Sequence, residues 1–296
     1  MSASNVPQVP ETLDGFAMLH QMFRIRQAAW RALDEARRAA IVADASALLA
    51  GFEGRAADEG QSACFSLLGH KGDLLVLHLR KGFDALNAAQ LELGRSALAE
   101  YLEPTTSYVS SIELGMYDGT VRTQRELLEK GFAPGSDEWA LGIEALRAEM
   151  RGAMKRRLWP AVPPRRYVCF YPMDKKRGET KNWYSTPIET RAEMMLEHGK
   201  IGRQYALTVT QIISGSIGFD DWEWGVDLFA DDPLVFKKLV YEMRFDQASA
   251  DYGLFGTFYL GVRFAANDLG AWLRGELPAW TSPAPLPQDR PHGAGR

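Results

Sequence analysis

The stretch VTQIISGSIGFDDWEWGVDLFA, residues 209–230, holds two apolar runs around a turn-forming segment. This pattern predicts a β-hairpin that turns near residues 218–221, where glycine and aspartate are found. Before the hairpin the sequence predicts a strand and then a helix, and after the hairpin it predicts a helix and then a strand. The helices are expected over 186–206 and 232–253, and the strands over 165–173 and 256–265. The order in this half of the chain is therefore β-α-β-β-α-β.

Two helix starts in this half carry clear sequence signals. Thr186 as N-cap, Pro187 as the first helical residue and Glu189 at the third position form a capping box. Asp232 is expected to cap the second helix, with Pro233 following it.

The first half of the chain repeats the same order. It predicts a strand over 13–25, a helix over 28–52, a hairpin over 63–79, a helix over 83–102 stopped by Pro104, and a strand over 106–117. Each half matches the ferredoxin-like arrangement, an antiparallel sheet with two helices on one face. The predicted fold class is α+β, with two ferredoxin-like halves per subunit forming a dimeric α+β barrel.

The organisation predicted for the whole chain has five segments. They are a flexible N-terminus (1–10), the N-terminal ferredoxin-like half (11–120), a helical and irregular connection (121–165), the C-terminal ferredoxin-like half (166–268) and a loose C-terminal segment (269–296). Within the connection, Ser136 followed by two acidic residues predicts a helix start.

The composition is that of an ordinary globular protein, with 46% hydrophobic residues and 24% charged residues. A net charge of −4 gives no reason to expect nucleic acid as a partner. Two cysteines far apart argue against a disulfide framework or a zinc site. Because we find neither a secretory signal nor an apolar run of membrane-spanning length, we expect a cytoplasmic protein without a membrane partner.

His198, in the stretch LEHGKIGRQY (196–205), is the candidate ligand-binding residue of the second half. Its spacing from Met194, Met195 and Ile201 places it on an apolar helix face. A buried histidine bonded to the backbone is the simpler interpretation. However, the neighbouring glycines 199 and 202 remove side chains from the helix and leave space for a large flat group. A neutral imidazole on such a face can ligate haem iron.

Cationic side chains near His198 suggest an anionic ligand. The run of three basic residues at 175–177 is, on charge alone, typical of a solvated turn. Arg244 lies between Met243 and Phe245 in a predicted apolar helix, so we expect it to be partly buried and to need an anionic partner. Carboxylates on a ligand would meet that need.

Several long motifs then carry a family resemblance over about residues 11–267. The sequence is similar to coproheme decarboxylases of the chlorite dismutase superfamily in YVCFYPMDKKR, MMLEHGKIGR, TQIISGSIGFDDWEWGVDLFADDP and YEMRFDQASADYGLFGTFYLG. The resemblance implies oxidative decarboxylation of two propionates of iron coproporphyrin III (coproheme) to vinyl groups. The product is haem b, hydrogen peroxide is the oxidant, and the step proceeds via a tyrosyl radical and ends coproporphyrin-dependent haem biosynthesis. It further implies a homopentamer and a transient contact with coproporphyrin ferrochelatase.

The resemblance also implies roles for individual residues. His198 would be the axial iron ligand, Tyr171 the radical-forming tyrosine, and Lys175 a proton donor or electrostatic partner of the reacting propionates. The residues implied around the porphyrin and its carboxylates are Arg157, Met173, Trp183, Arg203, Arg244 and Ser249. Gln211 would lie on the distal face.

Gln211 separates this activity from a neighbouring one. Chlorite dismutases have an arginine at the distal position, and a neutral amide supplies no such charge to an oxyanion. Chlorite dismutase or a haem peroxidase of the same fold stays an alternative, as do a non-catalytic haem carrier and a cofactor-free α+β protein.

Overall fold

The computed structural model describes residues 6–277 and residue 280. Its strands are β1 (Thr12–Ile25), β2 (Ser62–Leu67), β3 (Leu74–Arg80), β4 (Leu102–Gly115), β5 (Tyr167–Lys175), β6 (Thr210–Gly215), β7 (Trp224–Ala230), β8 (Gly253–Phe255) and β9 (Tyr259–Phe264). The order in the sheet is β7-β6-β4-β1-β3-β2-β9-β5-β8, and β7 also pairs with β5. That additional pairing closes eight strands into a barrel, and β8 pairs with the last residues of β5 on the edge that β9 also uses.

The two predicted ferredoxin-like halves are both present. In the first half the strands lie in the order β4-β1-β3-β2, and in the second half in the equivalent order β6-β7-β5-β9. The halves join where β4 pairs with β6 and where β2 pairs with β9. The predicted α+β fold is therefore confirmed, and both predicted hairpins are present as β2–β3 and β6–β7.

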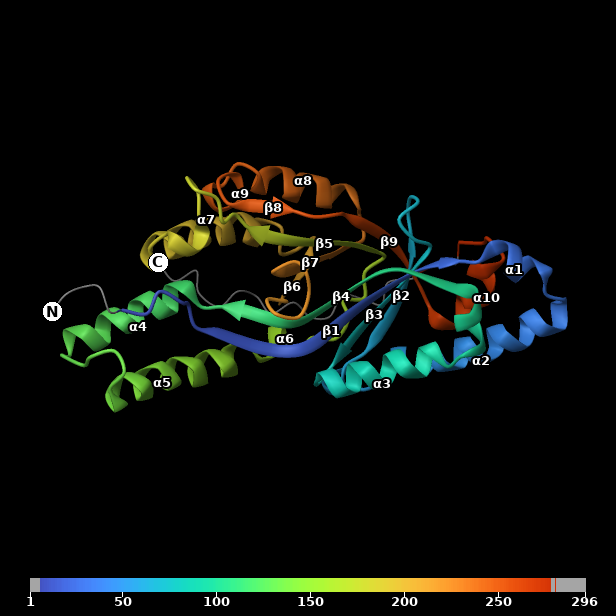
Figure 1. The fold of residues 1–296 in the computed structure, drawn as a ribbon, viewed down its shortest axis with the longest axis horizontal. Helices are drawn as coiled ribbons and strands as arrows, with labels where there is room; N and C mark the ends of the chain where they lie inside the picture. The colour runs from blue at the N-terminus through green and yellow to red at the C-terminus, as the bar shows by residue number, and fades with distance from the viewer. Residues whose placement is uncertain (1–5, 278–279, 281–296) are drawn as a thin grey trace.

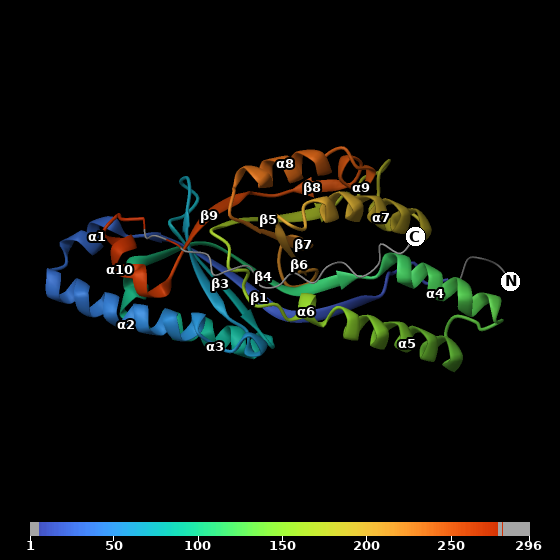
Figure 2. The ribbon, with the colours of Figure 1, turned by 180° about the vertical axis from the view of Figure 1, so that it is seen from behind.

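The helices cover the outside of the barrel. They are α1 (Gln27–Ala32), α2 (Glu35–Glu53), α3 (Phe83–Gly94), α4 (Tyr117–Glu129), α5 (Asp137–Ala153), α6 (Lys155–Leu158), α7 (Ile188–Gln204), α8 (Leu234–Met243), α9 (Gln247–Ala250) and α10 (Leu269–Leu273). In Figure 1, α2, α3 and α10 lie at one end of the long axis, and α7, α8 and α9 lie over β5 and β8 towards the other. The view from behind shows the same separation (Figure 2).

Apolar side chains fill the barrel interior and a second layer under the helices. Alternation along β5 sends Val168 and Phe170 inward, whereas Cys169 and Tyr171 face the layer under α8. This alternation matters for the site, because the outward face of β5 carries Tyr171 and Lys175.

A polar pair interrupts the apolar interior of the barrel. His20 on β1 and Asp227 on β7 are both fully buried, and His20 Nε2 lies 2.9 Å from Asp227 Oδ1. The His20 ring stacks on Phe170 at 3.9 Å between ring centroids. The pair therefore links the two halves across 207 residues of sequence.

Several local predictions need correction. The predicted helix over 28–52 is divided into α1 and α2, where Asp34 accepts a hydrogen bond from Arg37 N and starts α2. The second helix ends at Gly94, well before Pro104, which lies within β4. Ser136 caps α5 as predicted, because its side chain accepts a hydrogen bond from Trp139 N.

The predicted capping box at Thr186 is wrong. Pro187 is the N-cap of α7, and no side chain caps it. The Thr186 hydroxyl lies outside the helix start and donates instead to Asn182 O at 2.9 Å. At α8 the cap is Pro233, although the Asp232 carboxylate accepts from Leu234 N at 2.9 Å.

The segment predicted to be loose from residue 269 is ordered at its start. Residues 269–273 form α10, and Leu269 is buried against the core that includes α2. Residues 278–279 and 281–296 of the same prediction, and residues 1–5 of the predicted flexible N-terminus, lie outside the described residues. Among those that are described, no helix is both long and apolar enough to cross a membrane.

Candidate functional site

Three elements bring the predicted site residues together on the outside of the second half. α7 carries His198, the outward face of β5 carries Tyr171 and Lys175, and α9 carries Ser249. α9 contacts α7 and leads directly into β8, which pairs with β5 at Lys175. The neighbourhood of α7, α9, β5 and β8 can be followed in Figure 1.

His198 is held by a carboxylate. Its Nδ1 lies 2.9 Å from Asp246 Oδ2, and the Asp246 side chain is fully buried while that of His198 is 29% exposed. A carboxylate accepts hydrogen bonds, so this contact assigns the imidazole proton to Nδ1. The lone pair of Nε2 is then free to bind a ligand. Within the described part of the chain, Nε2 forms no hydrogen bond.

Asp246 is itself fixed by the start of α9. Its carboxylate accepts from Ser249 N and from Ser249 Oγ, each at 3.0 Å. Burial acts to raise the pKa of Asp246, but the hydrogen bonds from His198 and Ser249 outweigh it and lower the pKa below its usual value. Asp246 therefore stays a carboxylate, and a histidine oriented in this way is a strong ligand for a metal through Nε2.

Lys175 lies at the buried end of the outward face of β5. Its Nζ donates to Ala248 O at 2.8 Å and lies 4.5 Å from the centre of the Trp183 ring. Burial lowers the pKa of Lys175 to about 8, with the charge of Asp246 opposing the shift. Near neutral pH this ammonium can therefore give up a proton more easily than an exposed lysine.

Tyr171 is enclosed by aromatic rings. It is 5% exposed, stacks on Phe258 at 4.4 Å and lies 6.0 Å from Phe255. Burial raises the pKa of its phenol above the ordinary value, with Cys169 adding to the rise and Arg244 opposing it. The phenol is thus held protonated until a group that takes its proton comes near.

Gln211 faces α7 across the position of Gly202. A Cβ at Gly202 would lie 3.6 Å from Gln211 Oε1 and 3.3 Å from Met243 Cε. The absent side chain therefore lets this part of α7 approach β6 and α8 closely. Gly199, by contrast, neighbours the guanidinium of Arg203.

Arg244 is not partly buried as expected, and the other two predicted arginines are also exposed. Arg244 is exposed and follows the last residue of α8, so it is not inside an apolar helix. Its guanidinium stacks over Phe255 at 3.8 Å and so lies near Tyr171. Arg203 is also exposed, on the last turn of α7. Arg157 is exposed on α6, and no hydrogen bond, ion pair or ring contact between described residues joins it to the others.

Sequence reasoning missed Asp246, Phe255 and Phe258. The spacing of Asp246 from Ser249 is that of a helix N-cap and the residue it caps. This spacing is the local signal that could have placed Asp246 at a helix start. Its contact with His198 spans 48 residues, and no local pattern reports it. Met173 was predicted near the site, and it packs, partly buried, in the same layer as Tyr171.

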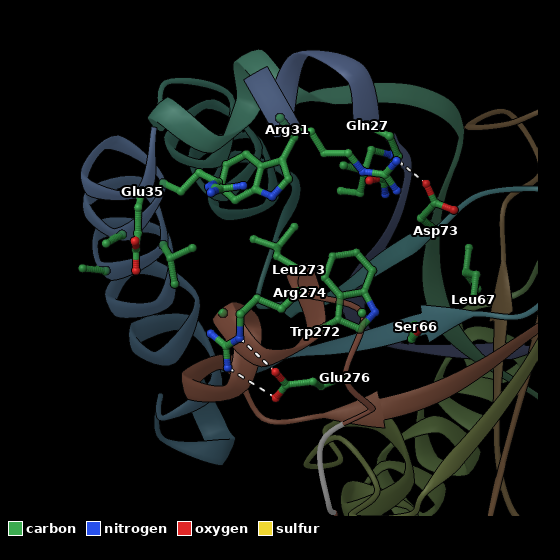
Figure 3. A pocket seen from close by; sticks show the side chains of 18 residues that line it. Gln27, Arg31, Glu35, Ser66, Leu67, Asp73, Trp272, Leu273, Arg274 and Glu276 are labelled. Atoms are coloured by element: carbon green, nitrogen blue, oxygen red, sulfur yellow. Dashed lines mark hydrogen bonds and ion pairs between the residues drawn. The ribbon is translucent and has the colours of Figure 1, made fainter. Parts of the chain in front are cut away.

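A large cavity lies elsewhere, in the first half. It has a volume of about 1010 Å³ and lies between α1, α2 and α10 (Figure 3). Charges of both signs line it, including Arg31, Glu35 and the ion pair of Arg274 with Glu276. None of the predicted site residues contributes to it.

The family model for chlorite dismutase matches residues 32–264. This chain therefore belongs to the chlorite dismutase family. The coproheme decarboxylase of Staphylococcus saprophyticus is 46% identical over 257 residues, which cover 86% of this chain and 94% of that protein. A protein of Haloquadratum walsbyi named as heme-binding is 45% identical over 91% of this chain, but the chain spans only 48% of its length.

Among solved structures, a heme-binding protein from Thermus thermophilus is similar with a TM-score of 0.77 and 40% identity. The match covers 91% of this chain and 99% of that one.

Proposed function

We propose that this protein is a coproheme decarboxylase that removes carbon dioxide from two propionates of coproheme and yields haem b. The observation that carries the proposal is His198, backed by the buried Asp246 and with Nε2 open, next to a strand that presents Tyr171 and Lys175. The identity of 46% to a coproheme decarboxylase over most of both chains supports it.

The donor set fits a porphyrin whose iron takes one protein ligand. A neutral imidazole with its second nitrogen held by a carboxylate is suited to iron. We assign Arg157, Met173, Arg203, Arg244 and Ser249 to the surroundings of the porphyrin carboxylates. Of these, Ser249 already touches the His198–Asp246 pair.

In the proposed reaction, bound coproheme with hydrogen peroxide supplies the oxidising equivalents. Tyr171 would give up an electron and its phenolic proton to this oxidant, and would then regain both by taking a hydrogen atom from the propionate. A buried phenol with a raised pKa does not ionise beforehand, so electron and proton leave together. Lys175, with its pKa of about 8, would pair with the reacting carboxylate or take part in the proton transfer.

Gln211 distinguishes decarboxylation from chlorite decomposition. We expect Gln211→Ala to keep most of the decarboxylation and mainly to change the binding of small ligands on the distal side, because a neutral amide takes no part in moving the tyrosine electron. Spectral titration with cyanide and product analysis on the same samples test this. Fast chlorite turnover by the wild type, or complete loss of decarboxylation in Gln211→Ala, would contradict it.

His198 is expected to be the iron ligand but not the main source of binding energy. His198→Ala should change the ferrous Soret spectrum and still bind the porphyrin, since charge-assisted hydrogen bonds to carboxylates contribute about 1.5–3 kcal/mol each. Resonance Raman spectroscopy of the iron–histidine stretch measures the effect. An unchanged stretch in the variant would refute the assignment.

One experiment tests the function directly. Ferric coproheme is bound, stoichiometric peroxide is added, and the porphyrin is identified by mass. Loss of two carbon dioxide units is the expected result. Intact coproheme with rapid chlorite turnover would point to a dismutase, and intact coproheme that is handed to an acceptor would point to a carrier. A homopentamer and a contact with a ferrochelatase belong to the same proposal.

A further inference from the structure

The turn between β2 and β3 reaches from the first half of the chain to the aromatic rings around Tyr171. Lys71 Nζ donates a hydrogen bond to Phe258 O at 2.5 Å, across 187 residues of sequence. Leu68 N donates to Leu260 O at 2.8 Å, so the start of the turn is joined to β9 as well. Figures 1 and 2 both show this turn projecting beside β9. A side chain of the first half is therefore bonded to the residue whose ring stacks on Tyr171.

Phe258 lies where the pairing along β5 is irregular. The register of β5 shifts by one residue between its pairing with β9 and its pairing with β8. Residues 171–172 therefore face three residues, 256–258, as in a β-bulge. Pro172 lies at this point and has no N–H for the ladder. A Cβ at Gly256 would lie 2.8 Å from Pro172 Cγ, so the segment passes very close to β5 there. Because Phe258 is outside the regular strands, its position depends more on contacts such as that with the first half.

The ring of Phe258 forms one side of the enclosure around Tyr171. The two rings are stacked, with 4.4 Å between centroids and an interplanar angle of 24°. The ring of Phe255 is farther away, at 6.0 Å, and is tilted by 51°. Since Phe258 is the closer and the more nearly parallel ring, its displacement would uncover a face of the buried phenol.

Lys71 also acts on this face of β5 through its charge. Burial raises the pKa of Cys169 to about 12, and the positive charge of Lys71 opposes the rise. Cys169 lies two residues before Tyr171 on the same outward face. The Lys71 ammonium lies 5.7 Å from the centre of the Tyr259 ring. The lysine therefore faces the layer that contains Tyr171 and does more than touch one carbonyl at its edge.

We propose that Lys71 is a positioning residue of the site, which holds Phe258 over Tyr171 and keeps this side of the phenol ring enclosed. This inference rests on the proposed function. An oxidised tyrosine that solutes can reach loses its oxidising equivalent in side reactions, such as coupling to a second phenol, and enclosure prevents them. No other residue proposed for the site comes from the first half, so Lys71 would be the contribution of that half to the chemistry.

The first test uses the substrate-free protein and measures how well a reagent reaches Tyr171. Tetranitromethane nitrates accessible tyrosines, and trypsin then releases one peptide, residues 167–175, in which Tyr167 is the internal reference. Lys71→Met removes the ammonium and keeps an unbranched side chain. We expect nitration of Tyr171 relative to Tyr167 to rise about fivefold, because a hydrogen bond from a charged donor is lost. Lys71→Arg can still donate to Phe258 O and should stay near the wild type.

A double-mutant cycle tests whether Lys71 acts through Phe258. Phe258→Leu removes the stacked ring and should raise nitration of Tyr171 at least as much as Lys71→Met. Adding Lys71→Met to Phe258→Leu should then raise it by less than about twofold, because the two changes remove the same cover. Lys81→Met, which removes another exposed lysine of the first half, should leave nitration unchanged. Wild-type nitration of Tyr171 in Lys71→Met or in Phe258→Leu, or a full further increase in the double variant, overturns the inference.

The second test loads the protein with ferric coproheme and adds peroxide. In Lys71→Met we expect the haem b formed per peroxide consumed to fall several-fold, while coproheme affinity, measured by Soret titration, stays the same. A general loss of structure would lower the affinity as well. A wild-type yield per peroxide in Lys71→Met overturns the inference. Absence of haem b from the wild type contradicts the proposed function instead, and the nitration cycle then decides alone whether Lys71 holds Phe258 over Tyr171.

Discussion

Tyr171→Phe should fold, bind coproheme and consume peroxide, yet form almost no haem b. Phenylalanine keeps the ring that stacks on Phe258 but has no phenolic proton and is much harder to oxidise. The hydroxyl of Tyr171 makes no hydrogen bond to the described residues, so its removal breaks no contact that they provide. We expect the rate of carbon dioxide release to fall by roughly two orders of magnitude or more, the scale seen when a proton-transferring side chain is lost.

The matched control is Tyr167→Phe. Tyr167 shares the outward face of β5 and packs partly buried in the same layer, but it lies farther from Lys175. It should remain active, and coproheme affinity measured by Soret titration should be similar in both variants. Haem b formation by Tyr171→Phe at near the wild-type rate would disprove the radical assignment.

Asp227→Ala should be the most destabilising single change outside the site. It would leave His20 fully buried with no partner for Nε2, and a buried polar group left without its hydrogen-bond partner costs about 1–3 kcal/mol. Asp227→Asn keeps an acceptor oxygen and should cost less. Urea denaturation followed by circular dichroism measures both, as a shift in midpoint at constant slope.

An apolar replacement of both partners provides the control. His20→Phe/Asp227→Leu removes both polar groups and keeps a ring against Phe170, so it should recover most of the lost stability. Asp251→Ala, which breaks an exposed pair with Lys181, should have little effect. Wild-type stability in Asp227→Ala would mean that the His20–Asp227 contact does not contribute to the free energy of unfolding.

The element order could be predicted from the sequence because its signals are local. Apolar runs around a glycine turn gave both hairpins, and the repeat of the order gave the two halves. The errors arose where one side chain had competing partners. Thr186 has the residue type of a cap, but its hydroxyl is bonded to Asn182. Arg244 follows an apolar pattern, yet α8 ends at the residue before it.

The site could be predicted only in part. The face of His198 follows from helical periodicity, and the nearby glycines are visible in sequence. The choice of Tyr171 over Tyr167 came from a family motif, since alternation places both on one face. The partners that give these residues their chemistry are distant in sequence. Asp246 lies 48 residues from His198, and Ala248 lies 73 residues from Lys175.

The two junctions between the halves bear on how such a chain could have arisen. β4 meets β6 through two residue pairs, and β2 meets β9 through four. Each half alone would present two open sheet edges with unpaired N–H and C=O groups. A second copy of the same half offers the counterpart of both edges, because the strand orders are equivalent. A gene of half the length could thus have made this barrel as a pair of identical chains, and fusion after duplication would have freed one copy to specialise.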